Sequence, residues 1–438
     1  MINIFWFRRD LRLHDNAGLY HALRSDLPVQ CIFIFDKEIL KKLPAEDARV
    51  TFLYDEIQRL NTELNELGSS LKVYYDTPQK AWKNITSEFD ISTVFTNRDY
   101  EPYAKARDQK IESFLKKSTI QFKTFKDHII FEKEEVTKDD GLPYTVFTPY
   151  KNKWLKKLET KMSGKSSYYF KSYPNKKFFS QLNQEIGDLE ITLSQMKFKR
   201  SEIEIPSTVV AQKIIKNYDA NRNFPAIDGT SKLGVHFRFG TISVREKARK
   251  AQSLNQTYLS ELIWRDFYST ILDSFPHVIE RAFRAKYDNI EWRTNEEEYQ
   301  LWKEGKTGYP LVDAGMRELN ATGYMHNRVR MVVASFLTKH LLIHWSWGES
   351  YFAEKLLDFD LASNNGGWQW ASGTGTDAAP YFRIFNPTSQ LKKFDKDLVY
   401  VKQWVPEYGT DKYPEPMVDH KFARERCLAT YKEGLNNL

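Results

Sequence analysis

The first part of the chain alternates short apolar runs with amphipathic stretches. Apolar runs typical of strands buried on both faces occur at INIFWF (2–7), VQCIFIF (29–35), LKVYY (71–75), TVFTN (93–97) and QFKTF (121–125). After the second run, leucine and isoleucine recur at steps of four and three from Leu53 to Leu67, which predicts a helix that ends at Gly68. Strands that alternate with helices predict a doubly wound parallel α/β domain over residues 1–130.

The pattern changes after this domain. Residues 131–205 are polar and rich in lysine, with little sustained periodicity, and are expected to form a long, partly helical linker. Over residues 206–438 the strand pattern is lost and apolar positions recur at helical spacing. The expected fold class is therefore an N-terminal α/β domain with a doubly wound parallel sheet, joined by the linker to an all-α C-terminal domain.

Composition narrows the class of protein. A chain of 438 residues can bury a large core, and the net charge of +7 is compatible with a polyanionic partner without requiring one. Cys31 and Cys427 lack the spacing of a zinc site or a disulfide framework. No apolar run reaches the ~20 residues of a membrane span, and no signal peptide opens the chain. We expect a cytoplasmic monomer without a metal ion or a membrane contact.

Motifs for nucleotide binding are missing from the α/β domain. No GxGxxG follows the first apolar run, and no GxxxxGK[ST] occurs anywhere in the chain. The sequence detail that exceeds the needs of packing lies instead in the helical half. In ELIWRDFY (261–268), Glu261, Trp264 and Arg265 share one face of a helix. Taken alone, this trio is better described as a surface ion pair beside a ring.

Two further segments combine polar and apolar positions at helical spacing. In GYMHNRVRMVVASFL (323–337), Asn327 and Met331 lie one turn apart with Arg330 beside them, and Arg328 projects about 100° away from Asn327. The sequence DFD (358–360) supplies two carboxylates, Asp358 and Asp360. Two carboxylates are few for a divalent metal ion, so pairing with Arg330 is the favoured interpretation.

The segment SNNGGWQW (363–370) contains two rings whose directions differ. On a helix, Trp368 and Trp370 lie about 200° apart, so one ring faces inward and the other outward toward a ligand. The loop GTSKLG (229–234) adds glycines and hydroxyls with backbone N–H groups suited to phosphate, which is a weak signal alone.

Together these segments resemble the DNA photolyase and cryptochrome family. The resemblance rests on ELIWRDFY, on WKEGKTGYPLVDAGMRELNATGYMHNRVRM (302–331), on LLDFDLASNNGGWQWASGTGTDAAPYFRIFNP (356–387), on FWFRRDLRLHDN (5–16) and on TVFTPYKNKWL (145–155). It covers almost the whole chain in the order of the family. It implies a U-shaped FAD inside the helical domain, with DNA docking over the mouth of the pocket.

The resemblance also assigns cofactor residues. The FAD phosphates would be held by Tyr218, Thr230, Ser231, Lys232, Leu233 and Gly234, although the family usually has Arg and Ser in place of Lys232 and Gly234. Arg330 and Asp358 would form a charge pair against the isoalloxazine. Asp360 and Asn364 would contact its polar edge, with Asn364 facing N5, and Arg265 belongs to the same site.

The substrate and the electron route follow by the same resemblance. Trp264 and Trp370 would stack on a flipped-out pyrimidine dimer, Glu261 and Asn327 would hydrogen-bond its bases, and Met331 would line the slot. Desolvation beside the rings is expected to raise the pKa of Glu261. DNA backbone phosphates would be contacted by Arg222, Arg328 and Arg383. Trp368, Trp345 and Trp292 match the chain of tryptophans that carries electrons from the surface to the flavin.

The resemblance is greatest to class I cyclobutane pyrimidine dimer photolyases, which implies light-driven repair of DNA by electron transfer from reduced FAD. A (6-4) photolyase would have a histidine pair in the MHNRVRM segment, and the DASH branch spaces its tryptophans differently. A cryptochrome photoreceptor often has a long C-terminal extension, whereas about 50 residues follow NPTSQ (386–390) here. A flavodoxin-like carrier leaves the helical half unexplained.

The resemblance leaves open whether the protein binds a second chromophore that acts as an antenna. Folate antennas of the family are contacted by Asn and Glu before an RARD-like run, and this chain has Tyr103 and Ala104 before KARD (105–108). Folate at that site is therefore not expected; a deazaflavin, another flavin or no antenna are the remaining alternatives.

Overall fold

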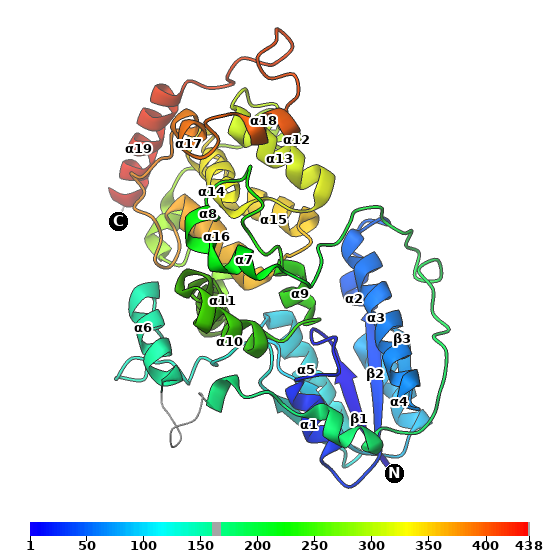
Figure 1. Cartoon of the computed structure of the whole chain (residues 1–438). Coiled ribbons are helices and arrows are strands. Elements are labelled where there is room, and N and C mark those ends of the chain that lie inside the picture. Colours follow the sequence, from blue (N-terminus) through cyan, green and yellow to red (C-terminus); the bar gives the residue numbers. More distant parts are fainter. Residues whose placement is uncertain (160–167, 437–438) are drawn as a thin grey trace. The chain divides into compact units, whose positions relative to one another are not determined.

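The structure, a computed structural model, describes residues 1–159 and 168–436 and is drawn in Figure 1. The chain divides into two compact units. The sheet unit comprises residues 1–136, 154–208 and 233–253, and the helical unit comprises residues 137–153, 209–232 and 254–438. Each unit is described by itself below.

The sheet unit is built on five parallel strands. The strands are β1 (Ile2–Phe7), β2 (Val29–Asp36), β3 (Leu71–Asp76), β4 (Ile91–Asn97) and β5 (Gln121–Phe125). Their order across the sheet is β3-β2-β1-β4-β5, and in this register Phe5 of β1 pairs with Cys31 of β2 and Phe95 of β4. The five apolar runs are these strands, and the predicted fold class is confirmed.

Both faces of the sheet are covered, because successive side chains of a strand point to opposite faces. The helices of this unit are α1 (Ala17–Leu23), α2 (Lys37–Leu40), α3 (Ala48–Glu66), α4 (Pro78–Glu88) and α5 (Pro102–Lys116), followed later by η1 (Tyr168–Phe170), η2 (Asn175–Gln181) and α9 (Gly234–Phe239). On one face of the sheet, Phe5 and Phe7 pack with α1 and α3, and on the other Ile4 and Trp6 pack with α4 and α5. Gly68, just beyond α3, has a φ of +80°, as expected of a helix stop.

The helical unit surrounds a second core, in which Trp302, Val333, Trp345 and Trp368 are buried. Its helices are α7 (Gln212–Lys216), α8 (Tyr218–Asn221), α11 (Gln256–Ser274), η3 (Pro276–Ile279), η4 (Ala285–Asn289), α12 (Glu296–Glu304), α13 (Pro310–Thr322), α14 (Asn327–Ser335), the π-helical turn η5 (Phe336–His340), α15 (Trp345–Lys355), α16 (Leu361–Ser372), α17 (Pro387–Phe394), α18 (Val399–Trp404) and α19 (His420–Asn436). Helices α6 (Phe147–Leu158) and α10 (Val244–Leu254) contain residues of both units.

Helix α16 packs against α11, α14 and α15, and two glycines allow the close approach. A β-carbon at Gly366 would lie 2.2 Å from the ring of Tyr268 on α11. A β-carbon at Gly348 of α15 would lie 2.0 Å from the indole of Trp368 on α16. Neither position can accept a larger residue unless the helices move apart.

One backbone oxygen anchors the C-terminal end of α16. The carbonyl of Ser372 accepts a hydrogen bond from Nζ of Lys339 at 2.6 Å and another from the hydroxyl of Tyr431 on α19 at 2.7 Å. Burial lowers the pKa of Lys339 to about 8. Its ammonium also lies 3.8 Å from the centre of the Tyr431 ring, a cation–π contact.

Within residues 1–159 and 168–436, no helix is both long and apolar enough to cross a lipid bilayer.

Adjacent glycines of α16 predict opposite effects on stability. Gly366→Ala should lower the unfolding free energy by about 1–3 kcal/mol, because the new methyl group clashes with Tyr268. Gly367→Ala is the matched control: its β-carbon would meet no heavy atom of the described chain within 4 Å, and alanine favours a helix by about 1 kcal/mol. Chemical denaturation of the flavin-free protein measures both, and equal stability of the two variants would contradict the packing.

Mild acid is expected to lower the stability of the protein because of His326. It caps α14 by accepting the N–H of Arg328 at Nδ1, and burial, together with Arg330 and Arg328, lowers its pKa from 6.5 to about 4. The unfolded chain therefore binds a proton that the folded chain excludes, and the unfolding free energy falls as the pH drops from about 6.5 to about 4. His326→Asn keeps a capping oxygen but not this proton, so its stability should fall less steeply across this window. Urea unfolding at several pH values compares the slopes, and identical slopes would refute the assignment.

Candidate active site

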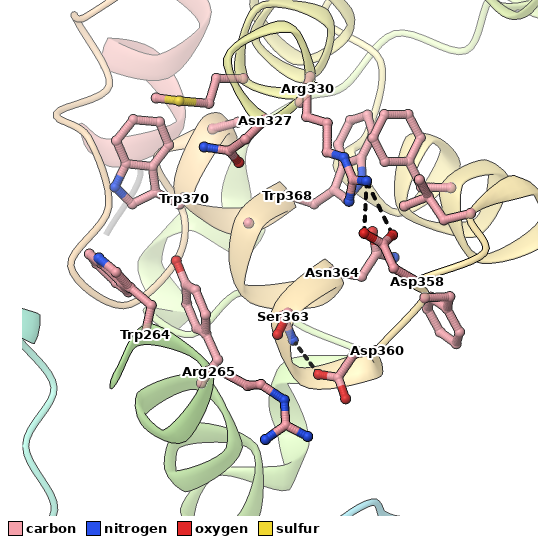
Figure 2. Close-up of a pocket in the computed structure, with 18 of the residues that line it drawn as sticks. Trp264, Arg265, Asn327, Arg330, Asp358, Asp360, Ser363, Asn364, Trp368 and Trp370 are labelled. Carbon is pink, nitrogen blue, oxygen red and sulfur yellow. Dashed lines mark hydrogen bonds and ion pairs between the residues drawn. The ribbon is translucent and has the colours of Figure 1, made fainter. Parts of the chain in front are cut away.

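A cavity of about 440 Å³ opens in the helical unit among α11, α14, α15 and α16, and Figure 2 shows its interior. The lining residues are Arg222, Glu261, Trp264, Arg265, Tyr268, Asn327, Arg330, Met331, Ala334, Phe352, Leu356, Asp358, Phe359, Asp360, Ser363, Asn364, Gly367, Trp368, Trp370 and Ala371. Most of the residues proposed from the sequence for the flavin and the dimer are therefore brought together. The volume is typical of a small-molecule or cofactor site.

Helical spacing accounts for the residues that α11 and α14 contribute. Glu261, Trp264 and Arg265 lie on one face of α11 and all line the cavity. Asn327 and Met331 do the same from α14. Arg328 points elsewhere, and its Nη2 donates to Oδ1 of Asn223 at 2.8 Å.

A charge pair stands at one side of the cavity. Nη2 of Arg330 donates to both carboxylate oxygens of Asp358, at 3.1 and 3.0 Å, as Figure 2 shows. Nε of Arg330 donates to the carbonyl of Met325 at 2.7 Å. Burial lowers the pKa of Arg330, but the carboxylate of Asp358 more than compensates, so the pKa is raised and the guanidinium stays charged. This is the pairing expected from the DFD sequence.

Asn364 is oriented by a residue that sequence reasoning missed. Its Nδ2 donates to the carbonyl of Glu349 at 3.0 Å and to Oε1 of the same residue at 2.9 Å. Burial raises the pKa of Glu349. No spacing connects Glu349 on α15 with Asn364 on α16, so only the packing of these helices reveals the pair. Asp360 caps α16 by accepting the N–H of Ser363 at 3.1 Å.

Glu261 is paired with Arg222 inside the cavity. Nη1 of Arg222 donates to Oε1 of Glu261. Burial raises the pKa of Glu261, in the direction expected, while the arginine opposes the shift. Arg222 was expected at DNA phosphates from the resemblance, and in this structure its partner is a carboxylate of the cavity. Arg383 is exposed on the segment after α16.

The tryptophans of α16 face different surroundings, as their spacing predicts. Trp368 is buried, whereas Trp370 is half-buried and lies on the same side of the cavity as Trp264 in Figure 2. Trp345 and Trp292 lie outside the cavity lining. The imidazole of His344 contacts both rings, with centroids 5.1 Å from Trp345 and 5.2 Å from Trp292. His344 was not anticipated from the sequence.

The loop proposed for phosphate binding does not line this cavity. The hydroxyl of Thr230 lies 3.1 Å from that of Tyr324, and the hydroxyl of Tyr258 donates to Ser231 at 3.0 Å. Lys232 adopts a φ of +51°, a left-handed backbone conformation. Tyr218 packs edge-on against Tyr258, with ring centroids 5.1 Å apart. The last two residues of the loop, Leu233 and Gly234, belong to the sheet unit.

The groups around the cavity fit a flavin. The Arg330–Asp358 pair and the amide of Asn364 could supply charge and hydrogen-bonding groups to such a ring system, and Trp368 and Phe352 could supply apolar surface. Gly367 lines the same space, and a side chain there would fill it. In the described residues, no group of three or more His, Cys, Asp or Glu side chains could hold a metal ion.

Comparison with known proteins finds two matching family models. The model of DNA photolyase matches residues 3–166, and that of the FAD binding domain of DNA photolyase matches residues 258–411. The second range contains α14, α15, α16 and α11 from its third residue onward, the helices that form the cavity.

Similar proteins match over nearly the full chain. The deoxyribodipyrimidine photo-lyase of Escherichia coli is 36% identical over 98% of this chain and 98% of its own, and that of Halobacterium salinarum is 34% identical over 99% of each. A class III photolyase structure from Agrobacterium tumefaciens has a TM-score of 0.84 and 31% identity, covering 100% of this chain and 98% of that one. A photolyase structure from Sulfolobus tokodaii with two FAD molecules has a TM-score of 0.83 and 33% identity, covering 99% and 100%. The chain belongs to the DNA photolyase family.

Proposed function

We propose that the protein is a light-driven deoxyribodipyrimidine photo-lyase that repairs cyclobutane pyrimidine dimers in DNA. The observation that carries this proposal is the composition of one cavity. Two indoles, Trp264 and Trp370, stand on one side of it, and the Arg330–Asp358 pair stands on another. Enzymes that act on a base take it out of the stack and bind it between aromatic or apolar side chains. The names of the relatives support the same activity.

FAD is the cofactor that the cavity fits. Arg330, Asp358 and Asn364 would orient the isoalloxazine, and Asp360 would support the helix end that carries Asn364. When bound and reduced, FAD supplies the light-absorbing electron donor. Thr230, Ser231 and Lys232 are the candidates for the phosphates, because Lys232 has a φ of +51° and a left-handed residue is part of the backbone nests that bind anions.

The lesion would bind between the aromatic side chains and the polar groups of α11 and α14. The rings of Trp264 and Trp370 offer stacking surfaces, worth about 1–3 kcal/mol per base in other proteins. Asn327 would donate and accept hydrogen bonds at the base edges. Glu261, whose pKa is raised by burial, would hydrogen-bond there as an acid once Arg222 turns to a phosphate. Arg328 and Arg383 are further candidates for phosphate contacts, which set affinity and register.

A photoreceptor role is the alternative. A cryptochrome structure from Synechocystis has a TM-score of 0.85 at 25% identity, covering 98% of this chain and 99% of that one. The photo-lyases of Escherichia coli and Halobacterium salinarum are more similar in sequence, at 36% and 34% identity. Sequence similarity therefore favours the repair enzyme over the photoreceptor.

A second chromophore is compatible with this proposal. The Sulfolobus tokodaii photolyase contains two FAD molecules, one of them implicated as a light-harvesting cofactor. In this chain the hydroxyl of Tyr103 donates to Asp36 at the carboxyl end of β2. The absorption spectrum of the purified protein distinguishes a flavin, a deazaflavin and no antenna.

Blue light should repair thymine dimers in an oligonucleotide bound to the protein with fully reduced FAD. Repair is followed as the return of absorbance at the wavelength of intact thymine, and an identical sample in the dark is the control. Dimers that persist after illumination would refute the enzymatic assignment and favour the photoreceptor.

Trp292→Phe should slow the photoreduction of oxidised FAD by about tenfold or more, which corresponds to at least about 1.4 kcal/mol in activation free energy. It should leave repair by prereduced enzyme unchanged, because Trp292 lies outside the cavity lining. Trp347→Phe is the matched control, since Trp347 is also half-buried and packs against Tyr299 with ring centroids 5.0 Å apart. Photoreduction at the wild-type rate in Trp292→Phe would show that another donor dominates.

A further inference from the structure

A buried ring covers one face of Trp264. The ring of Phe147 lies parallel to the indole, with centroids 3.6 Å apart and an interplanar angle of 7°. Phe147 is 7% exposed and is not among the residues that line the cavity, whereas Trp264 is. One face of Trp264 is therefore taken by Phe147. The rings of Phe267 and Tyr268 also contact the indole, with centroids 5.6 and 5.4 Å away, and the indole still lines the cavity.

The backbone around Phe147 is bound to the loop that follows α16. The N–H of Phe147 donates to Oδ2 of Asp377 at 3.1 Å. The hydroxyl of Thr376 donates to the carbonyl of Thr145 at 2.6 Å. Asp377 has a φ of +45°, a left-handed conformation that is uncommon for a residue with a β-carbon and that these contacts hold in place.

Phe147 therefore links α11 to the loop that follows α16. Its ring lies on Trp264 of α11, and its N–H is bound to the loop directly after α16, which carries Trp370. A shift of either element would break one of these contacts. A residue that lines no part of the cavity therefore joins the helix of Trp264 to the loop that follows the helix of Trp370.

Such a contact matters for stacking. A base gains the full stacking energy only if the indole lies parallel to it, and a tryptophan side chain without support can rotate about two torsions. The parallel ring of Phe147, with its centroid 3.6 Å from that of the indole, adds to the contacts of Phe267 and Tyr268 and restricts rotations that would turn the indole out of this plane. The indole then loses its conformational entropy when the protein folds, so DNA binding does not have to order it.

We infer that Phe147 is a positioning residue for damage recognition: it fixes the plane of Trp264 and its distance from Trp370, so that a flipped pyrimidine dimer is preferred over an undamaged strand. This inference rests on the proposed function. Phe147 acts through Trp264 and does not touch the substrate.

The test uses the full chain loaded with FAD. Phe147→Leu keeps an apolar side chain of similar volume but removes the flat ring. The measured quantities are the dissociation constants for an oligonucleotide with one thymine dimer and for the same oligonucleotide without it, together with the quantum yield of repair at saturating DNA. We expect affinity for the dimer to fall about tenfold, within the range of one lost stacking contact. Affinity for undamaged DNA, FAD content and quantum yield should stay within twofold.

Two further variants separate positioning from packing. Phe147→Tyr keeps a flat ring and should restore the preference for the dimer. Phe283→Leu makes the same replacement at another aromatic pair of the helical unit, with Phe275 at 5.2 Å, and should leave the preference unchanged.

Three outcomes would overturn the inference. These are a wild-type preference in Phe147→Leu, an equal loss of affinity for both oligonucleotides accompanied by loss of FAD, and a failure of Phe147→Tyr to restore the preference. If the wild-type protein itself neither prefers nor repairs the dimer, the proposed function fails instead.

Discussion

The close approach of α16 to its neighbours is the constraint on which the site depends. Gly366 lets the ring of Tyr268 lie against the backbone of α16. Gly348 lets the indole of Trp368, on α16, lie against the backbone of α15. The same helix supplies Asn364, Trp368 and Trp370 to the cavity. If α16 moved outward by the width of a methyl group, these three side chains would separate from those of α11 and α14.

Within this frame, the polar groups of the cavity are held in pairs. Arg330 is paired with Asp358, Arg222 with Glu261, and Asn364 with Glu349. Charges removed from water are costly unless they are paired, which favours these contacts. Because each contact is a hydrogen bond, it also restricts the orientation of the side chains that make it. The Arg330–Asp358 and Asn364–Glu349 pairs thus present a defined pattern to a ligand before it arrives, which lowers the cost of binding.

Much of the fold and part of the site follow from local periodicity. Runs of apolar residues located the five strands, and helical spacing placed Glu261, Trp264 and Arg265 together and Trp368 and Trp370 apart. The roles of these residues came from the resemblance to a family and not from spacing. Glu349, His344 and Phe147 were missed because each acts through a partner on another element. A contact between distant segments leaves no periodic signal in one sequence, and Phe147 alone has the pattern of an ordinary core residue.

The anchoring of Ser372 extends this dependence to the last helix. A carbonyl oxygen has two lone pairs, and here the ammonium of Lys339 and the hydroxyl of Tyr431 use both. If α19 detached, the buried carbonyl of Ser372 would lose the hydrogen bond from Tyr431. The ammonium of Lys339 would lose its cation–π contact with the same ring. Among the described residues α19 contributes none of the cavity lining, yet Tyr431 joins it to the end of α16. We therefore expect fraying of α19 to loosen the helix that carries Trp370.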